Sequence, residues 1–278
     1  MCKLYKTWCN CIIVIAILGI LTGCGISTYQ KLFGVRGDFG YRILDQKVIF
    51  SIWDGSRQVD YVIDNADPDT FKVLFDHEYA IDQHHVYKKQ NSIPYADPPS
   101  FELLSRWHAV DRKHGFHNGE LIAGSDPGTF QELNSSFSKD RRDVYIGGSG
   151  IGACDSSTFE LLLNFWGKDR ECAYNGFNIV KGADVDSFEA LSRYYAKDNK
   201  FVYVSTGRKL KNAEIEELPN SVRKRVHSGG WLSVVVRLEK VDVQTFEVIP
   251  EQDIYARDGN KCYKFQKSIR CSEIDREC

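Results

Sequence analysis

Apolar and polar positions recur along this chain with a nearly constant period. The recurring pattern is an Asp, two variable residues, a Ser or Thr, and then a Phe. The Phe residues that end the pattern are Phe71, Phe101, Phe130, Phe159, Phe188 and Phe246. Their spacings are 30, 29, 29, 29 and 58 residues, so a degenerate copy of the same length occupies the last interval. A fixed period of about 20–50 residues is typical of repeat proteins.

The first part of each copy is predicted to be a short helix. The Asp four residues before each Phe is a preferred N-cap residue, and a Pro follows it in the first three copies. Apolar side chains then lie three and seven residues beyond the Phe, as at Phe188, Leu191 and Tyr195. This spacing predicts one apolar stripe on a helix of about three turns.

The second part of each copy is predicted to be a β-hairpin. A second Asp ends the helix region, and the residues at this position are Asp82, Asp111, Asp140, Asp169, Asp198 and Asp258. A short run rich in β-forming residues follows, such as Phe201 to Tyr203, and then a polar or Gly-bearing turn. The predicted fold class is therefore α+β: tandem repeats of about 29 residues, each a short helix plus a β-hairpin, stacked into an elongated single domain.

The repeat resembles the DKNYW family of bacterial repeat proteins. The signature A-D-x-x-[ST]-F-x-x-L, followed by Y-A-K-D-N-K-x-V-Y, is best kept between Ala183 and Tyr203. The resemblance covers roughly Ile63 to Tyr263, and the nearest approach to a literal DKNYW string is Asp198 to Phe201. The resemblance implies an envelope or secreted protein and supplies no active site.

Residues 1–23 have the features of a lipoprotein signal peptide. Two lysines precede an apolar run from Ile12 to Leu21, which is too short to span a bilayer. The tetrad Leu-Thr-Gly-Cys that ends at Cys24 resembles a bacterial lipobox, which implies cleavage before Cys24 and lipidation of that residue. An uncleaved anchor or an ordinary signal peptide is the alternative. Gly25 resembles the sorting pattern of outer-membrane lipoproteins, and residues 24–40 would form the lipidated cysteine and a tether.

The repeat domain is predicted to span residues 41–278. An incomplete opening copy precedes regular copies at 63–210, a degenerate copy at 211–241 and a last copy at 242–278. The degenerate copy carries Arg223, Arg225, His227 and Trp231 where the repeat pattern is lost. This copy is either a drifted repeat that still pairs its strand or a partner-binding surface, since Trp and Arg are favoured anchors at interfaces.

The cysteines favour an oxidising compartment and two disulfides. Nine cysteines are present, and five of them remain once the three in the signal peptide and the lipidated Cys24 are set aside. The pairs expected are Cys154 with Cys172 and Cys262 with Cys271, which leaves Cys278 over, although spacing alone does not fix connectivity. The net charge of −2 gives no general attraction to nucleic acid.

The sequence favours neither catalysis nor a bound cofactor. Gly148 to Ala153 matches a dinucleotide-binding G-x-G-x-x-A loop, but it falls at the turn position of the repeat. Five histidines between His84 and His117 lack the convergent further ligand and the orienting partners that a metal site needs. Paired aspartates that could suggest calcium are explained by capping and turn formation. An enzyme is therefore the least favoured class.

Repeat scaffolds present extended surfaces and usually bind partners. The predicted function is that of a non-enzymatic, lipid-anchored periplasmic binding protein at the outer membrane. It would contact a protein partner, and the membrane through its lipid, but not nucleic acid. By analogy, its sharpest form is an immunity lipoprotein that neutralises a toxic effector such as a secretion-system lipase. The alternative is an envelope structural or surface scaffold lipoprotein.

Overall fold

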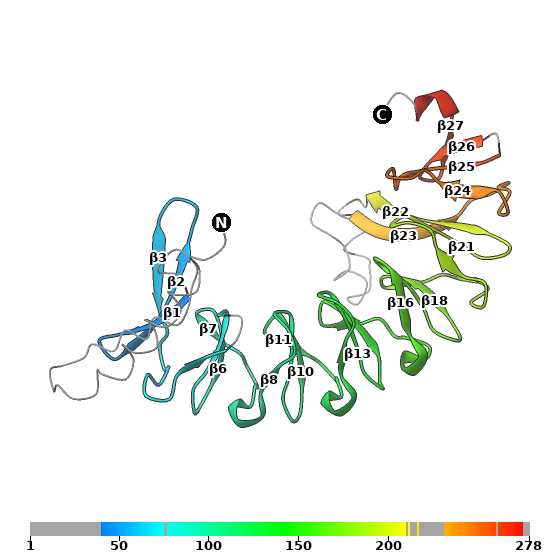
Figure 1. Cartoon of the computed structure of the whole chain (residues 1–278). Coiled ribbons are helices and arrows are strands. Elements are labelled where there is room, and N and C mark those ends of the chain that lie inside the picture. Colours follow the sequence, from blue (N-terminus) through cyan, green and yellow to red (C-terminus); the bar gives the residue numbers. More distant parts are fainter. Residues whose placement is uncertain are drawn as a thin grey trace, which may run out of the picture.

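The chain folds into a curved row of small antiparallel β-sheets. The computed structural model describes residues 40–74, 77–209, 211, 216, 231–259 and 261–274. Figure 1 shows the sheets following one another along an arc in chain order. Five buried apolar clusters are each shared by two sheets that are consecutive in the chain, as expected of a stacked repeat protein.

Seven sheets, which we call A to G in chain order, are formed by the described residues. Sheets A to C contain β1 (Gly40–Leu44), β2 (Lys47–Trp53), β3 (Gln58–Val62); β4 (Lys72–Val73), β5 (Tyr79–Ile81), β6 (Val86–Lys88), β7 (Asn91–Ser92); β8 (Glu102–Leu103), β9 (His108–Val110), β10 (Gly115–His117) and β11 (Glu120–Ile122). Sheets D and E contain β12 (Gln131–Glu132), β13 (Phe137–Lys139), β14 (Val144–Ile146), β15 (Ser149–Gly150); β16 (Glu160–Leu163), β17 (Trp166–Lys168), β18 (Ala173–Asn175) and β19 (Asn178–Ile179). Sheets F and G contain β20 (Glu189–Ala190), β21 (Tyr195–Lys197), β22 (Val202–Lys209), β23 (Trp231–Arg237); β24 (Phe246–Val248), β25 (Tyr255–Asp258), β26 (Lys261–Lys264) and β27 (Lys267–Ile269). Each sheet is a meander in which strands adjacent in sequence pair antiparallel.

The predicted three-turn helix after each Phe is absent from the described copies, so the α+β fold class is wrong. In sheet F the same residues form a hairpin, with β20 paired to β21. The hydroxyl of Ser192 accepts hydrogen bonds from the backbone N–H groups of Tyr194 and Tyr195, at 3.1 and 3.2 Å. Side-chain bonds of this kind compete with helical bonds and stabilise a turn. The chain therefore reverses direction at a point where a continuous helix was predicted.

The apolar spacing that predicted a helix is divided between the two faces of the sheet. Phe188 packs in the cluster that sheet F shares with sheet E, together with Trp166 and Tyr203. Tyr195, seven residues later, packs in the cluster that sheet F shares with sheet G. A spacing of seven places two side chains on one face of a helix. With a chain reversal between them, the same two side chains point to opposite faces of a sheet.

The repeat starts at Asp97, Asp126 and Asp155 form single 3-10 turns rather than α-helices. These turns are η1 (Pro98–Ser100), η2 (Pro127–Thr129) and η3 (Ser156–Thr158), and a further one, η4 (Cys271–Glu273), follows sheet G. Asp155 caps η3 by accepting a hydrogen bond from the N–H of Ser157 at 3.2 Å. Each of the first three turns ends at a Phe in an extended conformation. Among the described residues, no helix is long and apolar enough to cross a membrane.

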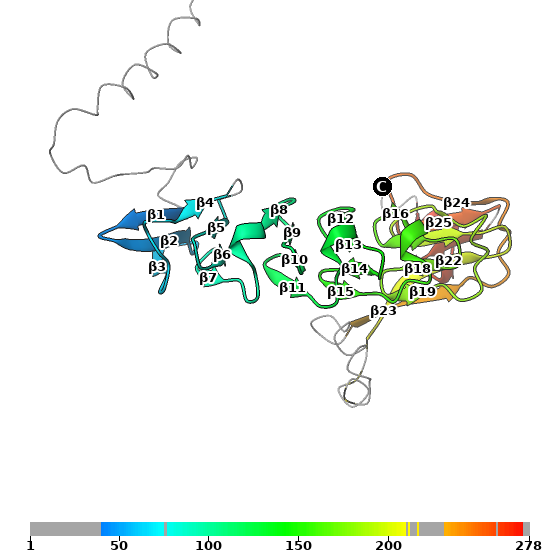
Figure 2. The same ribbon diagram turned by 90° about the horizontal axis from the view of Figure 1, so that it is seen from below.

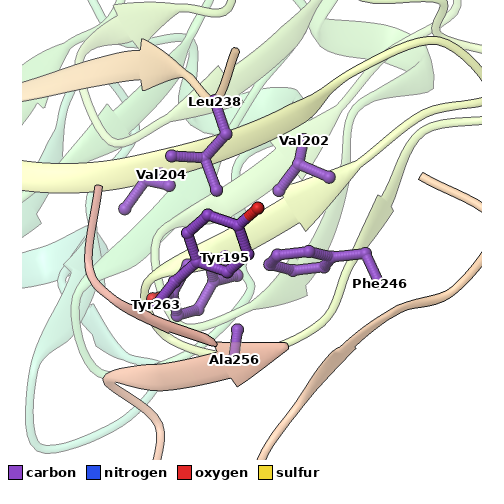
Figure 3. Close-up of a cluster of buried hydrophobic side chains, with 7 residues drawn as sticks. All are labelled: Tyr195, Val202, Val204, Leu238, Phe246, Ala256 and Tyr263. Atoms are coloured by element: carbon purple, nitrogen blue, oxygen red, sulfur yellow. The ribbon is translucent and has the colours of Figure 1, made fainter. Parts of the chain in front are cut away.

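Neighbouring sheets meet at a repeated aromatic joint. An aromatic side chain of one sheet, the repeated Phe, and an aromatic side chain of the next sheet pack together there. Figure 3 shows the joint between sheets F and G, where the ring centroids of Tyr195 and Phe246 are 5.6 Å apart and those of Phe246 and Tyr263 are 6.0 Å apart. The corresponding triads are Tyr41, Phe71, Tyr87; Tyr79, Phe101, Phe116; Phe137, Phe159, Tyr174; and Trp166, Phe188, Tyr203. The repeated Phe is thus the centre of a joint.

The strands run across the arc, so each sheet has one end on the concave side and one on the convex side (Figure 1). The 3-10 turns η1, η2 and η3 lie on the convex side, and we call this side the outer rim. The turns that join first to second and third to fourth strands lie at the opposite ends of the sheets, and we call this concave side the inner rim. Figure 2 shows the first strands of sheets C to E along one edge of the row and the fourth strands along the other.

Two disulfides reinforce the row, and they join the pairs expected from the sequence. Cys154 is bonded to Cys172 across a sequence separation of 18, and Cys262 to Cys271 across a separation of 9. Residues 1–39 and Cys278 lie outside the described part of the chain. The signal peptide at 1–23, the lipidation of Cys24 and the tether to residue 40 therefore stay predictions.

Candidate interaction surface

A buried Asp organises the outer rim of the regular copies. In sheet F, Oδ1 of Asp198 accepts hydrogen bonds from the N–H groups of Lys200 and Phe201, both at 2.7 Å. Oδ2 accepts from the N–H of Asp184 at 2.9 Å and from the hydroxyl of Tyr203 at 2.7 Å. Equivalent sets of four bonds surround Asp82, Asp140 and Asp169. This Asp holds a tight turn and the start of its own copy together.

These carboxyl and phenol groups are poorly suited to proton transfer near neutral pH. Burial raises the pKa of Asp198, but the hydrogen bonds that it accepts outweigh burial, and its pKa lies below the usual 3.8. Burial and the hydrogen bond to the Asp198 carboxylate both raise the pKa of Tyr203. A general acid or base works best with a pKa near the working pH, so these shifts favour the hydrogen-bonded, turn-holding role of the Asp and Tyr pair.

Several exposed Arg side chains of the outer rim form ion pairs with Asp residues of the same copy. In three successive copies an exposed Arg pairs with the first Asp of the copy, at 2.7 to 2.9 Å: Arg112 with Asp97, Arg141 with Asp126, and Arg170 with Asp155. The hydroxyl of Thr129 donates to Asp126 at 2.7 Å and accepts the N–H of Arg141 at 3.1 Å. In these three copies the convex side therefore carries Arg and Asp side chains that are already paired with one another.

The inner rim, in contrast, exposes large apolar side chains. Leu104 and Trp107 lie in the turn between β8 and β9, and Trp107 is 39% exposed. Leu163 and Phe165 lie at the equivalent turn two copies later, and Phe165 is 49% exposed. Arg106, in the same turn as Trp107, is 3.7 Å from the carboxylate of Glu78. From sheet C to sheet E, the concave side thus carries aromatic side chains with little unpaired charge beside them.

The last two strands of sheet F reach beyond the row of sheets. β22 and β23 pair along their length, from Tyr203 opposite Arg237 to Lys209 opposite Trp231. The fourth strand of sheet D or E has two residues, whereas β23 has seven. Figure 1 shows both long strands pointing into the concave side of the arc. The degenerate copy therefore keeps its strand pairing and lengthens it.

A groove with a volume of about 500 Å³ lies between β19 and β23. Its lining consists of Asn178, Ile179, Val180, Lys181, Tyr203, Val234, Val235, Val236 and Arg237. The amide nitrogen of Asn178 donates to the carbonyl of Ser233 at 3.3 Å. The guanidinium of Arg237 donates to the carbonyl of Lys181 and lies 4.3 Å from the ring centroid of Phe201. The groove has an apolar floor with two cationic side chains at one end.

The groove also lies along the edge of a sheet. β23 is the last strand of sheet F, and its half-exposed Val234, Val235 and Val236 form a continuous apolar run. Edge strands offer unpaired backbone groups to other chains, and most proteins protect them with short length or charge. β23 is long and has no charged residue before Arg237. We therefore define the candidate interaction surface as the inner-rim turns with Trp107 and Phe165, together with the β19–β23 groove.

The structure describes only part of the site predicted from the sequence. Arg223, Arg225 and His227 lie outside the described residues. Trp231 is the first residue of β23, but its side chain is not among those described. No group of three His, Cys, Asp or Glu side chains within the described ranges could hold a metal ion. The Gly148 to Ala153 segment that matches a dinucleotide loop contains the edge strand β15.

Sequence reasoning missed the exposed aromatic residues of the inner rim. Trp107 and Phe165 occupy the same position of the repeat, just before the aromatic residue that fills the joint. The same position holds Glu78, Ser136 and Tyr194 in other copies. The signal was present as large aromatic residues at a turn position. It was not recognised because those residues were assigned to the last turn of a predicted helix.

Comparisons with known proteins identify the family of the chain. No curated protein and no solved structure matches it. The sequence model of the DKNYY family matches residues 27–120 and 108–267, which together cover most of the chain. These two overlapping matches extend from before sheet A into sheet G, so they include all the regular copies. The resemblance inferred from the repeat signature is confirmed, and the matching family is named DKNYY rather than DKNYW. The chain belongs to the DKNYY family.

Proposed function

We propose that this chain is a non-enzymatic binding protein that holds a protein partner on the concave side of the arc. The observation that carries the proposal is the contrast between the two rims. Exposed aromatic side chains lie on the inner rim, and the long strands β22 and β23 reach into the concave side, while three exposed Arg side chains of the outer rim are paired with Asp residues of their own copies. Curved repeat proteins commonly use their concave side for binding.

The composition of the candidate surface supports a protein partner. The centres of protein interfaces are enriched in aromatic residues and Arg and depleted in other charged residues. Trp107, Phe165 and Arg237 match this composition. The edge strand β23 adds a second mode of contact, because an extended segment of a partner can pair with an exposed strand. A groove of about 500 Å³ is large enough to take several side chains of such a segment.

The proposal includes a lipid anchor and a place in the cell. Cys24 is the lipidated first residue of the mature protein, and residues 25–39 tether the arc to the periplasmic face of the outer membrane. Several acyl chains hold a protein stably on a membrane. The partner is then a protein that reaches the periplasm. In the sharpest form of the proposal it is a toxic effector, such as a lipase, that the lipoprotein neutralises.

The partner is found by capture with the soluble chain that begins at Gly25. Envelope and secreted fractions of the producing strain are passed over the immobilised protein, and the bound proteins are identified by mass spectrometry. One stoichiometric partner is expected, and an effector with a hydrolase or pore-forming sequence would support the inhibitor form. Weak capture of several abundant envelope proteins, without fixed stoichiometry, would favour the alternative of a structural scaffold.

Substitutions then test where the captured partner binds. Trp107→Ala combined with Phe165→Ala should weaken binding by about 2 kcal/mol or more, or roughly thirtyfold in Kd. The matched control is Tyr95→Ala, which removes an exposed aromatic side chain that lies near the outer rim, two residues before Asp97. An unchanged Kd for the double variant, with the fold intact by circular dichroism, would remove the inner rim from the proposal.

A further inference from the structure

The joint between sheets C and D differs from all other joints between described sheets. Clusters of buried apolar residues span the joints A–B, B–C, D–E, E–F and F–G, but none spans C–D. The F–G joint in Figure 3 shows the usual composition, with seven apolar or aromatic side chains and no unpaired polar atom. The C–D joint lies near the middle of the arc (Figure 1).

Three positions of the C–D joint carry smaller or more polar residues than their equivalents. His108 stands where the neighbouring copies have Tyr79, Phe137, Trp166 and Tyr195. Gly115 stands where they have Val86, Val144, Ala173 and Val202, and Ser138 stands where they have Ala80, Ala109, Gly167 and Ala196. A Cβ on Gly115 would lie 2.9 Å from the ring of Phe130, so that ring occupies the space that a larger side chain fills elsewhere.

His108 is buried without a hydrogen bond. The residue is 0% exposed, and neither Nδ1 nor Nε2 has a hydrogen-bond partner, nor does the hydroxyl of buried Ser138. Nδ1 lies 3.4 Å from a carboxylate oxygen of Glu132 on β12. The ring of His117, its cross-strand partner on β10, is centred 4.9 Å away. A buried polar group without a partner costs about 1–3 kcal/mol, so the joint is weakened where other joints gain stability.

The charged groups around His108 set the direction of its response to acid. Burial lowers the pKa of His108 and His117 lowers it further, Glu132 raises it, and the net pKa lies below the usual 6.5. Protonation of His108 is therefore less favourable in the folded joint than in the opened joint, where its pKa is about 6.5. The stability of the joint is complete above that pH and falls as the pH drops through and below 6.5.

We propose that the C–D joint is an acid-sensitive hinge, in which protonation of His108 separates the inner-rim ends of sheets C and D. His108 follows Trp107 directly, and His117 lies beside the next inner-rim turn, with Nε2 3.1 Å from the carbonyl of Ser135. Opening at this point changes the curvature of the arc and the distance between sheets A to C and sheets D to G. The hinge is a property of the chain alone and does not depend on the proposed partner.

Amide hydrogen exchange of the soluble chain at pH 7.5 and pH 5.5 tests the hinge. The comparison variant carries His108→Phe and Ser138→Ala. Phe is the residue at the equivalent position of the next joint, Phe137, and Ala is the commonest residue at the positions equivalent to Ser138. At pH 5.5, which is one unit below the ordinary pKa of histidine, protonation of His108 should make amides of β9, β10 and β13 exchange faster in the wild type, by up to about tenfold, and this increase should be absent from the variant. At pH 7.5 the ratio between the two proteins should be smaller. Equal ratios at the two pH values would overturn the proposal.

A reciprocal substitution and a shape measurement keep the test independent of one variant. Phe137→His, made in the joint-restored background, moves the histidine to the D–E joint and should move the acid-sensitive exchange to β13, β17 and β18. Small-angle scattering should show a change in the maximum dimension of the wild type between pH 7.5 and 5.5, and no change in the His108→Phe, Ser138→Ala variant. The same change in both proteins would show that other groups bend the arc, and the hinge at His108 would be rejected.

Discussion

In five copies the residue two positions before the repeated Asp takes a left-handed conformation that suits few residue types. The residues at this position include Asn65, Tyr95, Gly124, Gly182 and Lys240, with φ between 57° and 79°. Gly adopts such values without strain, and Asn does so more readily than other residues. Tyr95 has a φ of 66° and is 76% exposed, so it has strain and little packing to offset it.

Tyr95→Gly is therefore expected to stabilise the chain, although Gly usually destabilises. Relief of left-handed strain is worth about 1–2 kcal/mol, and the greater freedom of Gly in the unfolded chain returns part of it. A net gain of roughly 0.5–1 kcal/mol should appear in urea unfolding. The reciprocal control is Gly124→Tyr, where no other group lies within 4 Å of the added Cβ and only the backbone opposes the change. Stabilisation by both substitutions would show that strain at this position is not what limits stability.

The carboxylate of Asp198 is expected to be among the most sensitive single groups on the outer rim. In Asp198→Asn, the new amide NH₂ must face either the N–H groups of Lys200 and Phe201 or the donors from Asp184 and Tyr203. At least one buried donor pair then lacks an acceptor, which should cost about 2–3 kcal/mol in urea unfolding at pH 7. Tyr203→Phe removes one hydroxyl and should cost only about 1 kcal/mol, since Phe116 fills the same position in sheet C.

The effect of Asp198→Asn should shrink in acid. The folded pKa of Asp198 is lowered, because the hydrogen bonds that it accepts outweigh burial, so its carboxylate stabilises the fold above the usual pKa of 3.8. That contribution is lost as the pH falls through the folded value. The difference in unfolding free energy between wild type and variant should therefore be smaller at pH 3 than at pH 7. An equal difference at both values would mean that the ionised form is not what the four donors stabilise.

Sequence alone identified the positions of these residues but assigned some of them the wrong role. Asp155 caps its turn, as the N-cap preference indicated, whereas Asp97 and Asp126 make no cap hydrogen bond to the backbone of theirs. The second Asp was interpreted as the end of a helix, whereas in the structure it binds four donors from three segments of the copy. Those contacts join residues up to 16 positions apart, such as Asp242 and Asp258, and no local preference encodes them. His108 could have been recognised as a polar residue at a core position only after the strands had been placed.

At the scale of elements, the hairpin explains why helical periodicity was misleading. Leucine, phenylalanine and tyrosine three to seven residues apart satisfy a helix and a tight hairpin equally well. The hairpin is favoured over the helix by short polar side chains in the turn, such as Ser105, Asn134 and Ser192. Each accepts hydrogen bonds from the backbone N–H groups two and three residues ahead. The strand at Val202 and Tyr203 was predicted at its observed position, because β-branched and aromatic residues are concentrated there.

The disulfide between Cys154 and Cys172 is expected to stabilise sheet E without determining its fold. It joins the residue before Asp155 to the turn around Asp169, and the N–H of Asp155 already donates to Asp169 at 2.9 Å. Sister copies form the same turn without cysteine. Cys154→Ala with Cys172→Ala should therefore keep the fold and lower the unfolding free energy by about 3 kcal/mol, as estimated for a loop of this length.

The single variant Cys154→Ala is the control for that measurement. It breaks the same bond, so its cost in urea unfolding should match that of the double variant to within the effect of the remaining thiol of Cys172, which is partly buried. Loss of the circular dichroism of the folded chain in both variants would contradict the view that the Asp turn is sufficient on its own. A cost well below 1 kcal/mol would show that the unfolded chain gains little freedom when this loop opens.

At the scale of the whole molecule, the fixed period permits shortening by one unit. A stacked repeat protein is stabilised by each unit and by its contacts with two neighbours, so removal of a unit in phase preserves the remaining joints. The period and the stacking were visible in the sequence, because each Phe marks one joint. The curvature was not, since it depends on small rotations between sheets that no single residue specifies.

Deletion of residues 101–129 is the sharpest test of this view. It removes sheet C and joins Ser100 to Phe130, so that Tyr79, Phe130 and Tyr145 form a new aromatic joint between sheets B and D. Asp97 is then placed to donate its N–H to Asp140, and Ser100 to accept the N–H of Arg141, as in the intact copies. The shortened chain should unfold cooperatively in urea with a smaller m-value, because less surface is exposed on unfolding. It should also lack the acid response of the wild type, because His108 is gone.

A deletion of residues 101–122 removes almost as much chain but breaks the phase, and it should fail to fold. If both deletions fail, the joints are not interchangeable, and the aromatic triad is not what holds neighbouring sheets together.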